Sequence, residues 1–363
     1  MILHIVPGAD DVANGMARVA RLLAKEQGDA EVVDLAVVSD QWLAVSEGIG
    51  SLEEVWVHGM WLPREWAICR RVIKAGKRLV RMTHGSLSPV YLKNQSPIKK
   101  WLVRPIERYL LRRCEKIVAT CGAEAEWVRM YLGKKCPEIV VEDVKRFFDL
   151  KGERGMGNGE KDENSNNKKL NVLYLGRRHP LKGVEYLEKA VDEINDDSRS
   201  RESKLNSGIG NLSYEENLSI HCSTSTSNFD AKRIDLRIVS GAKGEELEKV
   251  WEWCDVLVLP TLSENFGLVV AEALERGKMV ITTDGAPVWE CSSRSYESKL
   301  NSGVGNSVDE RDLPVRCSTS TSDFDSNILS GYGGRLLYLK GYRDGTRNER
   351  VELLKKAIKF FRD

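Results

Sequence analysis

Short apolar runs alternate along the chain with longer stretches in which apolar side chains recur every three or four positions. Ile2–Val6 is an apolar run of strand length, and Ala13–Gln27 after it has the spacing of an amphipathic helix. The alternation resumes at Asn171–Leu175. Strands separated by helices predict parallel sheets, because a parallel neighbour can be reached only through a crossover. The other predicted strands are Glu31–Leu35, Val55–His58, Arg78–Thr83, Lys116–Thr120, Asp235–Val239, Val256–Leu259 and Met279–Thr283.

The pattern breaks once between its two halves. Residues 151–169 are rich in Gly, Asn and charged side chains and have a single apolar one, Met156, so they predict an interdomain linker. The expected fold class is therefore α/β, with two Rossmann-like domains built on doubly wound parallel sheets. The first domain spans residues 1–150 and the second residues 170–348, and a helix over residues 349–363 follows.

Two segments of the second domain are near copies of each other. Glu202–Asp230 and Glu297–Asp325 are identical at 19 of 29 aligned positions, without a gap. Both are rich in Ser, Thr, Asn and Gly, and two copies do not make a solenoid. We expect two loop insertions, because the entropic cost of a longer loop grows only with the logarithm of its length. His221, Cys222 and Cys317 lie inside them and are not expected to carry chemistry.

Composition excludes several classes of protein. Hydrophobic residues make up 41% of the chain, and 55 basic against 54 acidic residues give a formal net charge of +1, which argues against a nucleic-acid binder. No apolar run approaches the ~20 residues of a membrane-spanning helix. Met1–Pro7 lacks the basic start of a signal peptide, so we expect a cytoplasmic protein. The eight cysteines and five histidines form neither C-x-x-C nor H-x3–5-H, which predicts no metal site and no disulfide framework.

The most informative segment is Asp255–Gly285, DVLVLPTLSENFGLVVAEALERGKMVITTDG. It predicts a buried strand, a turn and a helix that opens near Asn265–Gly267. A helix start binds phosphate through its backbone N–H groups and partial positive charge, and Gly267 lets a ligand approach the backbone. Glu264 and Glu272 are about 80° apart around a helix axis. A carboxylate at each end of a phosphate-binding helix start suits a nucleotide-sugar, with Glu264 on sugar hydroxyls and Glu272 on the ribose.

Glu264-x7-Glu272 within LPTLSENFGLVVAEAL resembles the signature of the retaining family-4 glycosyltransferases. The resemblance implies the GT-B fold, in which two Rossmann-like domains face a cleft. LYLGRRHPLKG, Leu173–Gly183, is similar to the family's strand-G-R-x-x-P-x-K-G element. It implies that Arg177 and Lys182 project into the cleft and neutralise the departing diphosphate. The donor-binding residues implied at the helix start are Asn265, Phe266, Gly267 and Leu268.

The first domain matches the family in two loops that follow predicted strands. Val57–Trp61, VHGMW, and Thr83–Pro89, THGSLSP, are similar to the H-G loops of cell-envelope members. The family has its second histidine at the reaction centre, which implies that role for His84. Gly15 stands where the family has a glycine-rich loop against the donor phosphates.

The resemblance implies a retaining glycosyltransferase. It would move a sugar from a nucleotide diphosphate-sugar donor to a hydroxyl of a glycan or glycolipid acceptor, in bacterial envelope polysaccharide or lipopolysaccharide core synthesis. No cofactor and no metal are expected, since two cations and a helix start can neutralise the phosphates. A GT-B epimerase or hydrolase is one alternative, and a non-catalytic sugar-nucleotide-binding protein is another. The retention of Arg177, Lys182, Glu264 and Glu272 argues against decay of the site.

A basic stripe points to one further partner. Lys100, Arg104, Arg108 and Arg112 recur every four residues, and residues 96–116 hold seven basic and two acidic side chains, a local charge of +5. Pro105 predicts that a helix starts or kinks within the run. We expect reversible, peripheral attachment to an anionic membrane surface, the inner face of the cytoplasmic membrane.

Overall fold

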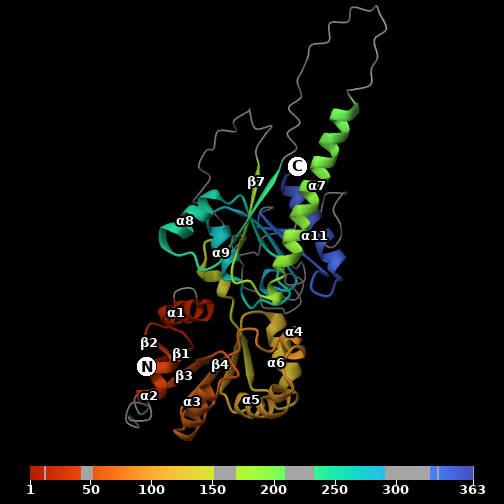
Figure 1. Ribbon diagram of the computed structural model, residues 1–363. Coiled ribbons are helices and arrows are strands. Elements are labelled where there is room, and N and C mark those ends of the chain that lie inside the picture. The colour runs from red at the N-terminus through yellow and green to blue at the C-terminus, as the bar shows by residue number, and fades with distance from the viewer. Residues whose placement is uncertain are drawn as a thin grey trace, which may run out of the picture. The chain divides into compact units, whose positions relative to one another are not determined.

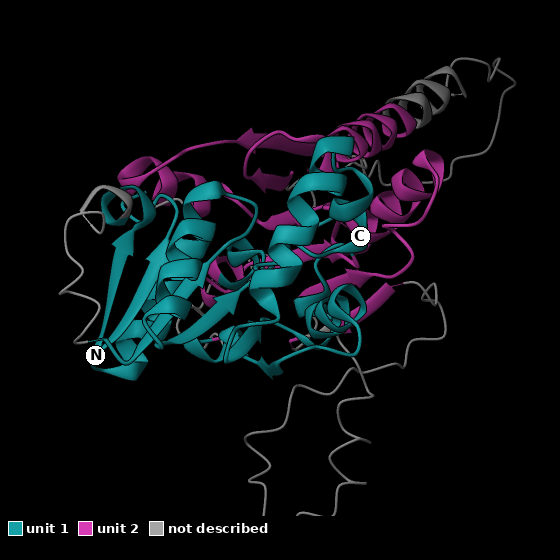
Figure 2. Cartoon of the chain, turned by 90° about the horizontal axis from the view of Figure 1, so that it is seen from below, with its two compact units in different colours: residues 1–149, 262–271, 285–290 teal, residues 150–261, 272–284, 291–363 magenta. Residues whose placement is uncertain are grey.

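The computed structural model describes residues 1–11, 14–41, 52–150, 169–208, 233–290, 328–332 and 335–362. By their contacts these residues form two compact units, coloured separately in Figure 2. Unit 1 consists of Met1–Asp149, Leu262–Ala271 and Gly285–Glu290; unit 2 consists of Leu150–Thr261, Glu272–Asp284 and Cys291–Asp363. The predicted linker lies outside the described residues except for Lys169, and so does the second repeat.

Unit 1 is built on a six-stranded sheet in the order β2-β1-β3-β4-β5-β6, in which every neighbouring pair is parallel. Helices cover the sheet (Figure 1), and the central strands β3 and β4 are buried at every position except Arg78. The strands are β1 (Ile2–Val6), β2 (Ala30–Asp34), β3 (Glu54–His58), β4 (Arg78–Met82), β5 (Lys116–Ala119) and β6 (Glu138–Val141). The helices are α1 (Gly15–Gln27), α2 (Leu35–Gln41), α3 (Pro63–Lys74), α4 (Pro89–Lys93), the π-helical turn η2 (Lys99–Val103), α5 (Arg104–Leu111), α6 (Gly122–Leu132) and the short η3 (Val144–Phe147).

Unit 2 contains a second six-stranded sheet, in the order β11-β12-β10-β9-β7-β8. Its strands are parallel except β11, which is antiparallel to β12. The strands are β7 (Leu170–Leu175), β8 (Ile234–Val239), β9 (Val256–Leu259), β10 (Met279–Thr283), β11 (Ile328–Gly331) and β12 (Leu336–Leu339). The helical elements of this half of the chain are η5 (Pro180–Lys182), α7 (Val184–Gly208), α8 (Gly244–Trp253), α9 (Leu268–Glu275), η6 (Pro287–Trp289) and α11 (Arg347–Arg362).

The predicted fold class is confirmed: the chain is α/β, with two doubly wound, parallel-dominated sheets. Every predicted strand is present, with ends that differ by no more than one residue. Helix α7 runs to Gly208 and so includes the first seven residues of the first repeat, whereas residues 209–230 lie outside the described residues. Helix α11 packs on α7 of its own unit, where Lys355 Nζ contacts Glu193 Oε2 at 2.9 Å.

Both sheets reverse their strand order beside the first strand of the unit. β1 has β2 on one side and β3 on the other, and β7 has β8 and β9 in the same arrangement. At such a switch point the connections leave in opposite directions, and doubly wound folds bind their ligands at the carboxyl ends of the strands there. The loops after β1, β3, β4, β7 and β9 carry the predicted motifs.

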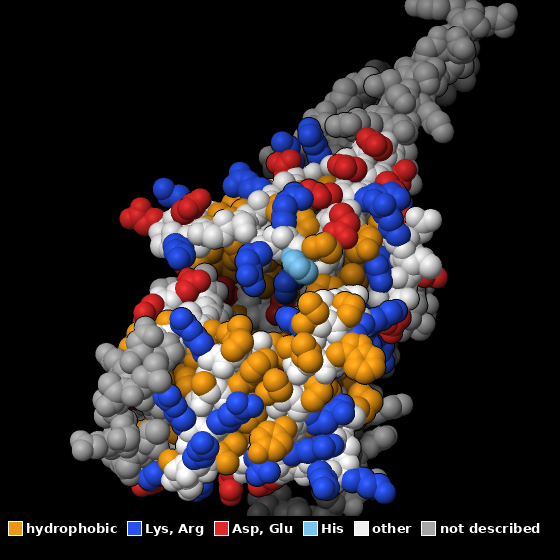
Figure 3. Space-filling view, turned by 60° about the horizontal axis from the view of Figure 1, so that its bottom comes forward, with side chains coloured by type: hydrophobic (Ala, Val, Ile, Leu, Met, Phe, Trp, Pro, Cys, Tyr) orange, Lys and Arg blue, Asp and Glu red, His pale blue; other side chains and the backbone are white. Residues whose placement is uncertain are grey.

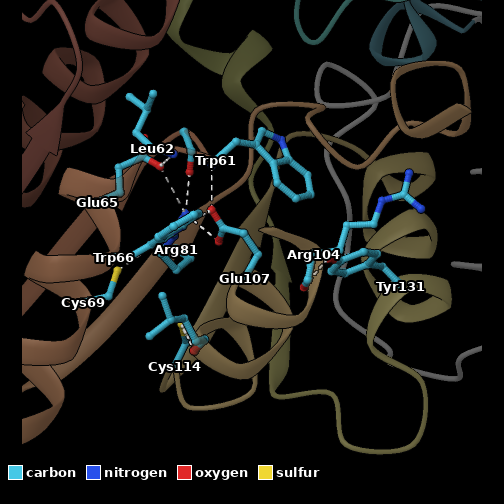
Figure 4. A network of polar contacts seen from close by, with 12 residues as sticks. Trp61, Leu62, Glu65, Trp66, Cys69, Arg81, Arg104, Glu107, Cys114 and Tyr131 are labelled. Atoms are coloured by element: carbon cyan, nitrogen blue, oxygen red, sulfur yellow. Dashed lines mark hydrogen bonds and ion pairs between the residues drawn. The ribbon is translucent and has the colours of Figure 1, made fainter. Parts of the chain in front are cut away.

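A buried arginine lies in the core of unit 1, against α3 and α5 (Figure 4). The Arg81 side chain, on β4, is 0% exposed, and its Nη2 lies 3.5 Å from Glu107 Oε2 and 3.9 Å from Glu65 Oε2. The same nitrogen donates to the carbonyl oxygen of Gly59 at 2.8 Å, and Nη1 contacts Cys69 Sγ at 3.0 Å. The guanidinium therefore joins β4 to α3, to α5 and to the loop that follows β3.

The two carboxylates hold that loop as well. Glu107 Oε1 accepts from the backbone N–H of Trp61 at 2.6 Å and from Trp66 Nε1 at 2.8 Å, and Glu65 Oε2 accepts from the N–H of Leu62 at 3.1 Å. Burial raises the pKa of Glu65 to about 7, although Arg81 acts to lower it. The His-Gly-Met-Trp loop thus depends on a charge cluster that no solvent screens.

Replacing Arg81 by Met tests this dependence. The change leaves Glu65 and Glu107 buried without their cation, and we expect it to lower the free energy of unfolding by about 3–5 kcal/mol. The matched control is Arg78→Met on the same strand, where a 54% exposed side chain pairs with Glu54; a loss within about 1 kcal/mol is expected there. Urea denaturation followed by circular dichroism measures both. Equal losses in the two variants would contradict the proposed role of the cluster.

Candidate functional site

Two histidine-glycine pairs mark the carboxyl ends of β3 and β4. His58 is the last residue of β3, and His84 follows β4 by two residues. Gly59 and Gly85 have φ of 86° and 70°, and His84 itself has a φ of 48°. Trp61, three residues after His58, has a φ of 81°. A left-handed backbone at a bulky residue costs on the order of 1–3 kcal/mol and is typical of functional sites.

Three histidine side chains form a hydrogen-bonded chain across the sheet of unit 1. His4 Nδ1 lies 2.9 Å from His58 Nε2, and His58 Nδ1 lies 2.9 Å from His84 Nε2. At one end His4 Nε2 lies 2.7 Å from Gln27 Oε1, and at the other His84 Nδ1 lies 3.2 Å from Asn265 Nδ2. The chain runs from the last residue of α1 to the motif residue Asn265.

Burial keeps all three rings neutral. It lowers the pKa of His4, lowers that of His58 well below the usual value, and lowers that of His84 to about 3. The Gln27 oxygen can only accept, so His4 donates from Nε2; each neutral ring then accepts at Nδ1 and donates from Nε2. The tautomers are fixed in one direction, and His84 ends the chain with an Nδ1 lone pair that accepts from Asn265.

Asn265 is held by a second network at the ends of β4 and β5. Thr120 Oγ1 lies 3.0 Å from Asn265 Oδ1. Glu124, 1% exposed in the first turn of α6, accepts from Thr83 Oγ1 and from the N–H of Gly85 through Oε1, at 2.6 and 2.5 Å. Its Oε2 accepts from the N–H and the hydroxyl of Thr120, both at 2.7 Å. One buried carboxylate thus positions the loops on either side of His84.

The predicted donor-binding helix start is ordered within unit 1. Glu264 Oε1 accepts from the N–H of Asn265 at 3.0 Å, and the N–H of Glu264 donates to Gly285 O at 2.8 Å. Phe266, 3% exposed, stacks on Phe148 with ring centroids 5.8 Å apart. Gly267 has a φ of 67°. These contacts fix the direction in which the chain enters α9.

One expectation about this segment needs correction. Helix α9 begins at Leu268, so Glu264 lies four residues before the helix and the 80° angle about a shared axis does not apply to it. Glu272 lies on the second turn of α9. Gly15, at the start of α1, faces Leu268: a Cβ added at Gly15 would lie 3.3 Å from Leu268 Cδ1. A larger residue at position 15 would press on the start of α9.

The basic loop of unit 2 follows β7. Lys182 ends the η5 turn and is half-buried, whereas Arg177 is exposed and its carbonyl oxygen accepts from Tyr174 Oη at 2.9 Å. Leu181 O accepts from Thr261 Oγ1 at 3.1 Å, which ties this loop to the residues after β9. Gly183 has a φ of 64°, and an added Cβ there would lie 2.2 Å from Pro260 O. Only glycine allows the two loops to approach this closely.

Two cavities lie elsewhere in the described residues. One, of about 270 Å³, is in unit 1 and is lined by residues that include Gln27, Trp56 and Lys116. The other, of about 430 Å³, is in unit 2 beside α11, with Asp344 and Glu349 in its wall. Within the described parts of the chain, no three His, Cys, Asp or Glu side chains are arranged to hold a metal ion. No helix among the same residues is long and apolar enough to span a bilayer.

Most of the support around His84 was not predicted from the sequence. His4 and Glu124 were not predicted to act with it, although His4 lies in a predicted strand and Glu124 lies four residues after one. Thr120 and Ser88 were also missed; Ser88 Oγ lies 3.1 Å from Ser263 Oγ, beside the Glu264 motif. The available signal was that polar residues follow several neighbouring parallel strands, whose ends meet at one edge of the sheet.

Comparison with known proteins bears on the second half of the chain. Residues 158–293 match the family Glycosyl transferases group 1. The uncharacterized glycosyltransferase MJ1607 of Methanocaldococcus jannaschii is 28% identical over 113 residues, which are 31% of this chain and 26% of that protein. The match thus spans about a quarter of the relative's length.

Solved structures are similar over more of the chain. An α,α-trehalose-phosphate synthase (UDP-forming) from Burkholderia xenovorans, in complex with glucose-6-phosphate, has a TM-score of 0.50 at 11% identity, covering 79% of this chain and 86% of the other. Anabaena Alr3699/HepE in complex with UDP and glucose has a TM-score of 0.48 at 13% identity, with 79% and 82% covered. The fold is that of GT-B glycosyltransferases.

The histidine chain predicts a pH-dependent stability. Because the folded state holds His4, His58 and His84 neutral, the unfolded state binds more protons below about pH 6.5, and stability falls as the pH falls by up to about 1.4 kcal/mol per pH unit for each histidine. Glu65, whose pKa is raised, has the opposite effect on the pH dependence of stability. Because both variants compared below retain Glu65, its contribution is the same in each.

His58→Gln keeps a donor and an acceptor but does not titrate. Between roughly pH 6 and pH 5, we expect the slope of the free energy of unfolding against pH to be smaller in this variant by about 1.4 kcal/mol per pH unit. His179→Gln is the control, because His179 is exposed and bonds only locally, to the N–H of Leu181. Urea midpoints measured across that range give both slopes. An unaltered slope in His58→Gln would contradict this, because it would show that the ring of His58 is protonated and charged in the folded state as well.

Proposed function

We propose that this protein is a retaining glycosyltransferase that moves a sugar from a nucleotide diphosphate-sugar to a hydroxyl of a glycan or glycolipid. The observation that carries the proposal is that the region matched to Glycosyl transferases group 1, residues 158–293, contains both the basic loop with Arg177 and Lys182 and the segment with Glu264 and Glu272. Each of the two segments follows a strand at the switch point of the second sheet.

The proposed charge chemistry belongs to the two cations. A nucleoside diphosphate gains negative charge as the bond to the sugar breaks, and a positive charge held beside it stabilises that change. The η5 turn and the contact of Leu181 with Thr261 hold the Arg177–Lys182 loop at the end of β7. A loop ordered before the donor binds loses little entropy when it does so. These two cations make a metal unnecessary in the proposal.

The carboxylates take the neutral parts of the donor. Glu264 is proposed to accept hydrogen bonds from hydroxyls of the transferred sugar, and Glu272 from those of the ribose. The start of α9, from Asn265 to Leu268, is proposed to bind phosphate oxygens through its backbone N–H groups. No side chain is assigned as a nucleophile.

His84 is proposed to contact the transferred sugar as a neutral hydrogen-bond acceptor. Its pKa, lowered to about 3 by burial, leaves the ring without a charge to offer the phosphates. Its Nε2 proton is committed to His58, so Nδ1 is the atom that can accept from a sugar hydroxyl, in exchange for its bond to Asn265. We also propose that the protein is cytoplasmic and acts in bacterial envelope polysaccharide or lipopolysaccharide core synthesis.

Two glutamine substitutions separate sugar binding from nucleotide binding. Glu264→Gln removes a charge-assisted bond to the sugar worth roughly 1.5–3 kcal/mol, so turnover should fall tenfold or more while the affinity for the nucleoside diphosphate alone stays unchanged. Glu272→Gln should instead weaken that affinity by about tenfold. Transfer is assayed with a panel of nucleotide-sugars, and affinity by calorimetry. Glu246→Gln, an exposed carboxylate on α8, is the control. Native turnover in Glu264→Gln would refute the assignment.

Removal of divalent cations tests the charge chemistry. Dialysis against EDTA should leave the transfer rate unchanged, because side-chain cations rather than a metal neutralise the leaving group. Arg177→Met with Lys182→Met should lower the rate sharply under both conditions. A rate that disappears with EDTA and returns with added Mg²⁺ would overturn this part of the proposal.

A further inference from the structure

An apolar cluster projects from the π-helical turn of unit 1. Ile98, Trp101 and Leu102 are 69%, 81% and 66% exposed, and Tyr109 on α5 is 51% exposed. Burying a side chain of this size is worth about 1.5–3 kcal/mol, and contiguous exposed apolar groups mark an interaction surface. On the face of unit 1 in Figure 3, hydrophobic side chains gather with Lys and Arg around them.

The backbone beneath the cluster is held firmly. Arg104, half-buried, donates from Nε to Gln95 Oε1 at 2.8 Å and from Nη2 to the carbonyl oxygen of Leu92. Tyr131 Oη donates to the carbonyl oxygen of Arg104 at 2.9 Å. The turn is thus fastened to the segment before it and to α6, so the exposed apolar groups belong to a constrained surface.

Exposed basic side chains lie in the same segments as the apolar cluster. Lys93, Lys100, Arg108 and Arg113 are exposed. Glu107, one of the two acidic residues in the segment, is 0% exposed and faces Arg81 in the core. One of the two negative charges that would offset the basic side chains is therefore turned inward, whereas Glu115 is exposed.

We propose that this surface, made of Ile98, Trp101, Leu102, Tyr109 and the basic side chains around them, docks on an anionic lipid bilayer. The basic residues attract the headgroups, and the exposed apolar side chains enter the boundary between headgroups and acyl chains, the depth that tryptophan prefers. A second copy of the chain is the poorer occupant, since two surfaces of the same positive charge repel when they meet. The proposal rests on this surface alone and is independent of the enzymatic activity.

Several basic residues of the predicted stripe make contacts within the protein and are therefore poor probes of lipid binding. The guanidinium of Arg104 is engaged in hydrogen bonds to Gln95 and Leu92. Arg112 donates from Nη2 to Leu132 O at 2.6 Å, and the Arg108 guanidinium lies 4.8 Å from the centre of the Tyr131 ring. A quadruple substitution of the stripe would disturb packing as well as charge. The informative charge set is therefore chosen from exposed basic side chains other than these three.

Vesicle co-sedimentation with two sets of variants tests the proposal. The apolar set is Ile98→Asn, Trp101→Gln and Leu102→Gln, and the charge set is Lys93→Gln, Lys100→Gln and Arg113→Gln. The wild type should bind vesicles of phosphatidylcholine and phosphatidylglycerol in equal parts at low salt, and bind pure phosphatidylcholine far more weakly. Each set should weaken binding to the anionic vesicles by about tenfold or more. Phe360→Gln with Lys249→Gln, which alters one apolar and one basic side chain of unit 2, is the matched control and should bind as the wild type does.

Fluorescence distinguishes insertion from charge attraction alone. Addition of anionic vesicles should shift the tryptophan emission to shorter wavelength, and Trp101→Phe should remove most of that shift although eight of the nine tryptophans remain. Circular dichroism and nucleoside diphosphate binding, measured on every variant, separate loss of the surface from loss of the fold.

Two results would overturn the proposal. The first is an apolar set that is folded and binds anionic vesicles as tightly as the wild type does. The second is a concentration-dependent dimer in analytical ultracentrifugation without lipid that the apolar set abolishes, since that result assigns the surface to a second copy.

Discussion

The guanidinium of Arg81 is the interaction on which unit 1 depends. It lies at 0% exposure between carboxylates from α3 and α5, and it holds the carbonyl oxygen of Gly59, the residue directly after His58. A buried cation is tolerated only where partners surround it, so the helices, the strand and the loop must be assembled together. The left-handed backbone at Trp61 persists because Glu107 holds its N–H.

The same cluster shapes the electrostatics of the histidines. Arg81 adds to burial in lowering the pKa of His58, and the neutral ring then fixes which nitrogen of His84 carries a proton. Glu124 meets a different requirement, since its four short hydrogen bonds fix the loops on either side of His84. Two buried charged groups thus set the environment of one uncharged side chain.

The fold was largely predictable because strands buried on both faces leave short, mainly apolar runs in the sequence. Strand β6 escaped prediction since it is a four-residue edge strand that is only half-buried. Strands β11 and β12 were not predicted either. Both are four residues long and follow the second repeat, so no helical pattern precedes them to mark an alternation of strand and helix. The resemblance of the motifs, rather than periodicity, indicated Glu264, Arg177 and Lys182.

The support around these residues could not be predicted in the same way. Glu65, Arg81 and Glu107 resemble solvated surface charges in the sequence, and only the packing of α3 and α5 on β4 shows that they are one cluster. The pairing of His4 with His58 depends on the register of β1 against β3, which places His4 opposite Trp56. Neither the partner of a strand nor its register follows from the strand's own residues.

The direction of the histidine chain has an electronic consequence. All three rings donate from Nε2 and accept at Nδ1, so their dipoles point the same way, from His84 towards Gln27. Aligned hydrogen bonds polarise one another, by about 10–30% per bond. Electron density is drawn towards the Nδ1 atoms as each N–H is pulled by the next ring. An imidazole that carries no charge is thereby made a stronger acceptor at the site, and reversing that polarity would require all three rings to exchange tautomers together.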